Sequence, residues 1–174
     1  MEFTFETDYN QKSLTAMARA IRKTLRRKKS RRSHIFGWGI IILGTLLCVL
    51  PGEDGYEFDF RIVITALAVL LLLAVMIWED SINGYAAKKR MLAGTDKAVS
   101  IFSEDGYSSA SEIGKTQWKY DTIKTIVEMP AYFIFVFSPN HAQVYNKSGM
   151  TGGTVDEFRE FIQKKTGLTI EKMK

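Results

Sequence analysis

Two long apolar runs dominate the pattern of hydrophobic and polar positions along the chain. They extend from Ile35 to Leu50 and from Ile62 to Trp78, and the second run contains no charged residue. At about 1.5 Å of rise per residue, each run approaches the roughly 30 Å thickness of a bilayer's hydrocarbon core. The pattern therefore predicts two membrane-spanning helices, joined by the short acidic loop 51–60.

Small residues interrupt the first apolar run. Gly37, Gly39 and Gly44 would let a neighbouring helix approach closely, although no two of them form a Gly-x-x-x-Gly pair. The single cysteine, Cys48, lies in the same run, so the chain can form no intramolecular disulfide. We expect Cys48 to face lipid or the other helix.

The residues before the apolar runs predict a strand and then a helix. Residues 2–7, Glu-Phe-Thr-Phe-Glu-Thr, alternate polar and aromatic side chains as a half-buried strand does. A strand this short needs a sheet to join, and we expect it to join the C-terminal sheet. Thr7 or Asp8 would cap the following helix, whose apolar positions recur every three or four residues. These positions are Leu14, Met17, Ala18, Ile21 and Leu25.

The residues after Ala98 predict a small antiparallel sheet and a terminal helix. Residues 132–137 are apolar on both faces, which is typical of a central strand, and the last helix would cover one of its sides. That helix is predicted to begin at Thr154, where Thr154 and Glu157 form a capping box, and to end at Gly167. With hairpin-length turns between them, the predicted strands are 98–103, 107–112, 115–120, 121–129, 132–138 and 141–146.

The expected fold class is thus an α+β membrane protein with four parts. Residues 1–33 form a cytosolic strand and a basic amphipathic helix, and residues 34–79 form a transmembrane helical hairpin. Residues 80–96 form a linker, and residues 97–174 form a cytosolic sheet-plus-helix domain.

The net charge of +5 belongs entirely to the first half of the chain. Residues 1–90 contain 14 basic and 9 acidic residues, whereas residues 91–174 contain 10 of each. This excess of positive charge lies beside an apolar helix rather than on the folded domain, which argues against nucleic acid as a partner. Lys and Arg beside a spanning helix mark its cytosolic side and attract anionic lipid, so both termini are expected in the cytosol. The predicted membrane-surface contacts are Arg22, Arg26, Arg27, Lys28, Lys29, Arg31, Arg32, Lys88, Lys89 and Arg90.

Several segments together resemble the YcxB-like family of bacterial membrane proteins. They are Phe-Ser-Glu-Asp-Gly-Tyr at 102–107, Gln-Trp-Lys-Tyr-Asp-Thr-Ile-Lys-Thr-Ile-Val-Glu at 117–128, Ala-Tyr-Phe-Ile-Phe-Val at 131–136, Asn146-Lys147, and Val-Asp-Glu-Phe-Arg-Glu-Phe-Ile at 155–162. The resemblance implies a bacterial inner-membrane location and a C-terminal domain similar to a pleckstrin-homology fold. Family members often carry Pro-Lys where this chain has Asn146-Lys147. The resemblance implies an architecture rather than an activity.

The sequence offers no catalytic, cofactor or metal constellation, so we expect a non-enzymatic protein. Its cytosolic domain would bind a protein or peptide partner at the membrane through Lys119, Tyr120 and Lys147, while Trp118 packs in the core. Anionic lipid head groups are the other expected partners, and self-association stays open.

Two other functions remain in view. One is an immunity or accessory protein of a toxin or transporter system, which needs no catalysis either. The other is an enzyme acting on lipid, which requires a polar catalytic group near the membrane interface. Only His34, the pair Glu79-Asp80 and the pair Asp54-Glu57 could supply such a group.

Overall fold

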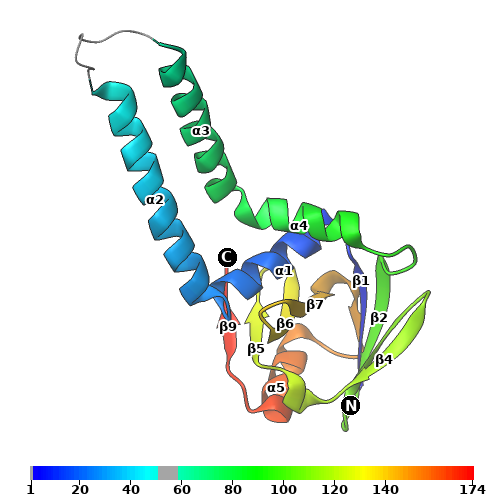
Figure 1. Ribbon diagram of the computed structural model, residues 1–174. Helices are drawn as coiled ribbons and strands as arrows, with labels where there is room; N and C mark the ends of the chain where they lie inside the picture. The colour runs from blue at the N-terminus through cyan, green and yellow to red at the C-terminus, as the bar shows by residue number, and fades with distance from the viewer. Residues whose placement is uncertain (1, 51–58) are drawn as a thin grey trace. The chain divides into compact units, whose positions relative to one another are not determined.

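The computed structural model describes residues 2–50 and 59–174 and divides the chain into two compact units (Figure 1). The first, called the folded unit, comprises residues 1–26 together with 80–174. The second, called the helix pair, comprises residues 27–79. This grouping differs from the expected four parts, because residues 1–26 and the expected linker 80–96 belong to the same unit as the C-terminal strands.

The folded unit contains two sheets rather than the single sheet expected. Their strand orders are β4-β3-β2-β1-β8 and β7-β6-β5-β9. The strands are β1 (Phe3–Asp8), β2 (Lys97–Phe102), β3 (Tyr107–Ser111), β4 (Gly114–Trp118), β5 (Thr125–Glu128), β6 (Tyr132–Ser138), β7 (His141–Asn146), β8 (Met150–Thr151) and β9 (Ile170–Lys172). Paired strands run antiparallel except β5 and β9, a parallel pair that the turn pattern did not predict.

Strand β1 completes the first sheet, which confirms that the N-terminal segment joins the C-terminal strands. It pairs with β2 along its whole length, from Phe3 opposite Phe102 to Asp8 opposite Lys97, and also pairs with β8. Phe3 and Phe5 are fully buried. The first eight residues therefore belong to the core of a domain whose other strands begin about ninety residues later.

Helix α1 (Gln11–Lys23) begins later than the sequence pattern predicted. Thr7 and Asp8 still belong to the β1–β2 ladder, so neither can cap a helix, and the predicted cap is wrong. Asn10 caps α1 instead, because its Oδ1 accepts a hydrogen bond from the backbone N–H of Ser13 at 3.0 Å. The inner face of α1 buries Leu14, Ala20 and Ile21.

Strand β6 is central, and both of its faces are covered, whereas the sequence predicted a covering helix on one side. Phe133 and Phe135 point into an aromatic core shared with β1, β2 and helix α5 (Val155–Thr166). Ile134 and Val136 point to the opposite face, where Ala20 and Ile21 of α1 cover them. This double burial explains why the strand is apolar on both faces from Phe133 to Val136.

Both predicted ends of α5 are confirmed. Thr154 and Glu157 form the reciprocal capping box, with the backbone N–H of Glu157 donating to Thr154 Oγ1 at 3.2 Å. Gly167 ends the helix in the left-handed region, with φ of 67°. Between them Phe158 inserts its ring among those of Phe3, Phe5, Phe102 and Phe133.

The helix pair consists of α2 (Arg27–Val49) and α3 (Phe60–Ile77). Both are long and apolar enough to cross a membrane by length and composition. Helix α2 begins at Arg27 rather than near Ile35, so the basic segment 27–32 forms the first turns of the same helix as the apolar run. The loop between the helices, with the candidates Asp54 and Glu57, lies outside the described residues.

Candidate functional site

The two helices of the pair meet through small residues of α2. Gly37, Ile41 and Gly44 are its buried positions. A methyl group added at Gly44 would lie 2.6 Å from Val69 Cγ2, and one added at Gly37 would lie 2.6 Å from Met76 Sδ. These two glycines therefore permit the close approach of α3, as expected, whereas Gly39 faces open space.

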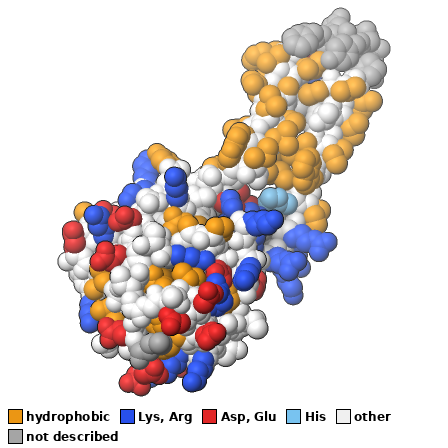
Figure 2. Space-filling view, turned by 180° about the vertical axis from the view of Figure 1, so that it is seen from behind, with side chains coloured by type: hydrophobic (Ala, Val, Ile, Leu, Met, Phe, Trp, Pro, Cys, Tyr) orange, Lys and Arg blue, Asp and Glu red, His pale blue; other side chains and the backbone are white. Residues whose placement is uncertain are grey.

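The large hydrophobic side chains of the pair point away from the seam. No residue of α3 is buried, and Leu71 is 67% exposed. Figure 2 shows hydrophobic side chains over the visible surface of this unit. The most exposed members are Ile35, Phe36, Ile42, Leu43, Leu47, Val49, Leu50, Phe60, Leu67, Leu70, Leu71 and Ile77. In water such a surface would be strongly unfavourable, at about 25 cal/mol for each Å² of apolar area left exposed.

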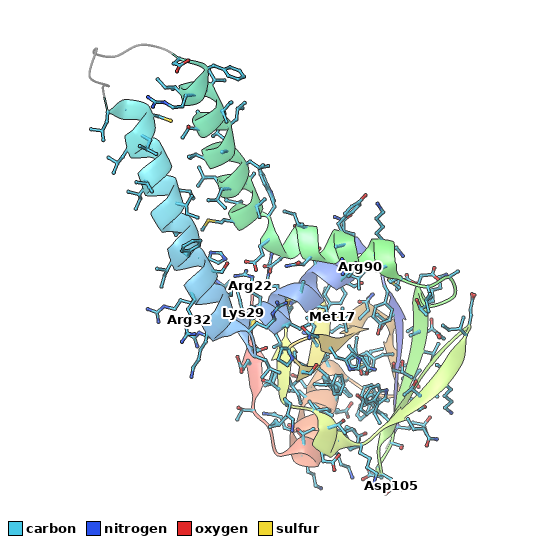
Figure 3. The ribbon with its side chains drawn as sticks, viewed as in Figure 1. Met17, Arg22, Lys29, Arg32, Arg90 and Asp105 are labelled. Carbon is cyan, nitrogen blue, oxygen red and sulfur yellow. The ribbon has the colours of Figure 1, made fainter. Side chains whose placement is uncertain are left out.

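Exposed cations occupy the first turns of α2, directly before its apolar surface. Figure 3 labels Lys29 and Arg32 on these turns. Five residues here are exposed, and the described part of the chain shows no acidic partner for any of them. They are Arg27, Lys28, Lys29, Arg31 and Arg32, all among the predicted membrane-surface contacts.

His34 and Glu79 form a polar pair within the helix pair. His34 Nε2 lies 2.8 Å from Glu79 Oε2, and each side chain is about one-third exposed, at 31% and 32%. The two residues flank the apolar parts of α2 and α3 in sequence. His34 and Glu79 were both considered as catalytic groups for lipid chemistry, and the helix pair brings them into contact.

Arg22 does not lie free for lipid, contrary to the prediction. Its Nε and Nη2 donate to the two carboxylate oxygens of Asp80 at 2.6 and 2.7 Å, and Arg19 Nε adds a longer contact of 3.4 Å. Asp80 is 8% exposed, so this bidentate pair ties α1 to helix α4 (Glu79–Arg90). The same pairing occupies Asp80, which follows Glu79 and was also considered for catalysis.

Of the three predicted partner-binding residues, the structure leaves only Lys119 exposed. Tyr120 is 7% exposed, and its hydroxyl donates to the backbone oxygens of Ser103 at 2.7 Å and Gly106 at 3.1 Å. The prediction for Tyr120 is wrong, because the 3-10 turn that begins there rotates its ring into the core. Lys147 is an ion-pair partner of Glu128.

Glu128 is the centre of a buried ion cluster. Lys147 Nζ donates to Glu128 Oε1 at 2.7 Å, and Arg159 donates to both oxygens at 2.8 and 2.9 Å. The hydrogen bonds from Arg159, with those from Lys147, lower the pKa of Glu128 to about 2 despite its burial. Arg159 also pairs with Asp156, so the cluster joins β5, α5 and the turn after β7. Its groups satisfy one another, which indicates a structural role.

A cleft of about 460 Å³ opens within the folded unit, and the sequence pattern gave no sign of it. Its wall includes Met17 of α1, Met91 and, where the two sheets come together, Trp118 and His141. Trp118 and His141 stack with Phe137, with ring centroids 5.0 to 5.3 Å apart. Partial burial lowers the pKa of His141 from its ordinary value. This cleft combines an apolar wall with hydroxyl and amide groups of Ser109, Ser111, Thr116 and Gln143.

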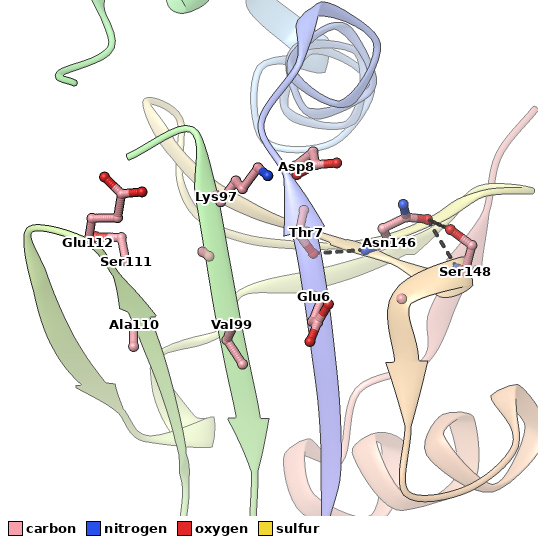
Figure 4. Close-up of a pocket in the computed structure, with 12 residues that line it drawn as sticks. Glu6, Thr7, Asp8, Lys97, Val99, Ala110, Ser111, Glu112, Asn146 and Ser148 are labelled. Atoms are coloured by element: carbon pink, nitrogen blue, oxygen red, sulfur yellow. Dashed lines mark hydrogen bonds between the residues drawn. The ribbon is translucent and has the colours of Figure 1, made fainter. Parts of the chain in front are cut away.

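A second pocket, of about 660 Å³, lies on the outer face of the first sheet (Figure 4). Glu6, Asp8 and Glu112 make it acidic, with Lys97 as the one cation of its lining. Asn146 borders it, donating its backbone N–H to Thr7 Oγ1 at 3.1 Å. Among the described residues, no group of three or more His, Cys, Asp or Glu side chains could hold a metal ion.

Residues 102–162 match the family model described as YcxB-like protein. The match extends from the end of β2 into α5, and it confirms the resemblance to the YcxB-like family for that segment. Comparison with curated proteins and with solved structures gave no match.

Proposed function

We propose that this chain, with its YcxB-like domain at residues 102–162, is a two-pass bacterial inner-membrane protein. Its folded unit would work in the cytosol as a non-enzymatic module that binds a protein or peptide. The observation that carries the proposal is the helix pair, where Gly37 and Gly44 face inward and large hydrophobic side chains face outward. A hydrocarbon environment makes this arrangement favourable, because lipid tails solvate the outward side chains.

Charge supports a cytosolic position for both termini. The exposed cations from Arg27 to Arg32 immediately precede the apolar part of α2, and Lys88, Lys89 and Arg90 lie at the end of α4, which follows α3. Each such cation gains roughly 1 kcal/mol near an anionic leaflet. Both flanks of the pair would therefore stay on the cytosolic side.

The two sheets and the terminal helix support a fold of pleckstrin-homology type for the folded unit. Within it, the 460 Å³ cleft is the surface we assign to a partner, since Tyr120 is buried and Lys147 is paired. Pockets that bind ligands usually combine an apolar wall with a few polar groups, as this one does.

A site-specific photo-crosslinker tests the partner assignment in the native membrane. It replaces Thr116, an exposed residue that lines the cleft, and in a control variant it replaces Lys172, an exposed residue on β9. We expect one protein to crosslink at position 116 and to be absent at 172. Crosslinks only to lipid, or only to a second copy of this chain, would contradict the partner role. A captured toxin or transporter subunit would instead identify the accessory role.

A further inference from the structure

We infer that helix α4 lies along the cytosolic surface of the membrane as an interfacial helix. Ile82 and Tyr85 would enter the head-group layer, and Lys89 and Arg90 would contact anionic lipid. The inference rests on the proposed membrane position of the helix pair and deepens it. It assigns a second, peripheral contact with lipid to the folded unit itself.

The side chains of α4 are arranged opposite to those of an ordinary surface helix. Its buried positions are a charged residue, Asp80, and a residue without a side chain, Gly84. Ile82 is 46% exposed and Tyr85 is 59% exposed, although both are large and apolar. Together with Lys89, these exposed residues recur at the i, i+3 and i+7 spacing that places them on one side of a helix.

Two contacts hold this orientation. The bidentate pair of Asp80 with Arg22 fixes the inner face of α4 on α1. At Gly84 the two helices approach so closely that an added methyl group would lie 2.7 Å from the backbone nitrogen of Thr15. Rotation of α4 to bury Ile82 and Tyr85 would break the ion pair and drive side chains into α1. The outward position of the apolar residues is therefore built into the packing.

Chain continuity and charge identify the occupant of this face as lipid. Only Trp78 separates the last residue of α3, Ile77, from the first residue of α4. If α3 crosses the bilayer, α4 must begin within a few ångströms of its surface. An exposed aromatic residue, an exposed aliphatic residue and terminal cations are residue types that can contact a membrane surface. The cations Lys89 and Arg90 are exposed and complement an anionic leaflet.

Fluorescence quenching by labelled lipid tests this placement in the full-length chain. In a Cys48→Ala background, a small environment-sensitive fluorophore is attached at Tyr85→Cys, and the protein is reconstituted in vesicles of phosphatidylglycerol and phosphatidylcholine. Separate vesicle preparations carry nitroxides close to the head group, which quench labels in the interfacial layer, or within the acyl chains, which quench labels in the hydrocarbon core. A matched label at Glu160→Cys, exposed on α5, is the control, since Figure 1 shows α4 and α5 at opposite ends of the folded unit. A third label at Leu70→Cys reports insertion of α3.

We expect quenching at positions 70 and 85, at least twofold stronger at 85 than at 160. Replacing Lys89 and Arg90 by Gln should reduce quenching at 85 and leave position 70 unchanged. Quenching at 70 with none above the control at 85 would overturn the interfacial helix while leaving the membrane hairpin intact. No quenching at 70 would refute the proposed membrane function itself.

Discussion

The helix pair and the folded unit place their hydrophobic side chains in opposite ways. In the folded unit, Phe5 and Phe158 are fully buried in a core of aromatic rings. In the helix pair, Phe36 is 71% exposed and the buried seam contains Gly37 and Gly44. The same kinds of residue thus occupy the inside of one unit and the outside of the other.

This difference agrees with the proposed membrane position of the helix pair. Water drives aromatic rings together, so the folded unit gains stability from a large core. Lipid provides no such force between helices, so in the proposed membrane position the pair would rely on close backbone approach through small residues. Changes to large residues should therefore affect the folded unit most, and changes to small residues should affect the helix pair most.

Deleting residues 2–8 should have the largest effect, because it removes β1 from its place between β2 and β8 in the first sheet. The deletion takes Phe3 and Phe5 out of the aromatic core and leaves β2 and β8 without their shared neighbour. We expect the folded unit to lose protease resistance altogether, while the helix pair stays in the membrane fraction. The exposed substitution Glu6→Gln serves as the control. Unchanged protease resistance of the deletion variant would contradict the role of β1.

Phe158→Ala should reduce the free energy of unfolding of the folded unit by about 3–5 kcal/mol, since it empties the centre of the ring cluster. Amide hydrogen exchange of β6 in the full-length protein measures this loss. Phe36→Ala, in the exposed surface of α2, is the matched control and should leave exchange in β6 unchanged. Equal effects of the two substitutions would break the contrast between the units.

Glu128→Gln should destabilise the folded unit by about 2–3 kcal/mol, because Lys147 and Arg159 lose their shared charged partner. Glu128 has a pKa of about 2 in the folded state, below its ordinary value. Its stabilising contribution is therefore complete above the unfolded-state pKa, near 4.3, and is lost as the pH falls toward 2. Denaturation curves recorded between pH 2 and 7 should show the free energy of unfolding falling toward pH 2. This fall should appear for the natural chain and for the exposed control Glu160→Gln. The same pH dependence of the free energy of unfolding in Glu128→Gln would show that another group causes it.

Gly44→Leu should weaken the helix pair by about 1–3 kcal/mol, because the new side chain collides with Val69. Gly39→Leu is the control, since Gly39 faces open space. Disulfide formation between Cys48 and Ile62→Cys reports the approach of the helices, as Cys48 Sγ lies 3.8 Å from the Ile62 backbone oxygen. Crosslinking should fall for Gly44→Leu alone. An equal fall for both variants would refute the specific seam.

Local pattern predicted much of the fold. The alternation in residues 2–7, the all-apolar β6 and the capping box at Thr154 each report which faces a segment buries, and that information is contained in a few neighbouring residues. The two apolar helices follow from length and composition for the same reason. The YcxB-like segment was likewise recognisable from its strand and helix motifs.

The candidate site was less predictable, because it depends on contacts between residues distant in sequence. Arg22 and Asp80 are 58 positions apart, so a basic helix that looked free for lipid proved to be paired. Tyr120 lies beyond the end of β4, and the 3-10 turn that starts there places its ring in the core, where it contacts residues distant in sequence. The cleft is formed by residues from both sheets and both of the helices α1 and α4, which no single segment reveals.

The topology of the full-length chain in intact bacteria tests the central claim most directly. In a Cys48→Ala background, single cysteines replace Gly55, in the loop between the apolar helices, and Lys174, at the C-terminal end. A maleimide that cannot cross the inner membrane should label position 55 in intact cells and should label position 174 only after permeabilisation. Labelling of position 174 in intact cells, or protection of both positions until permeabilisation, would contradict a two-pass protein with its folded unit in the cytosol.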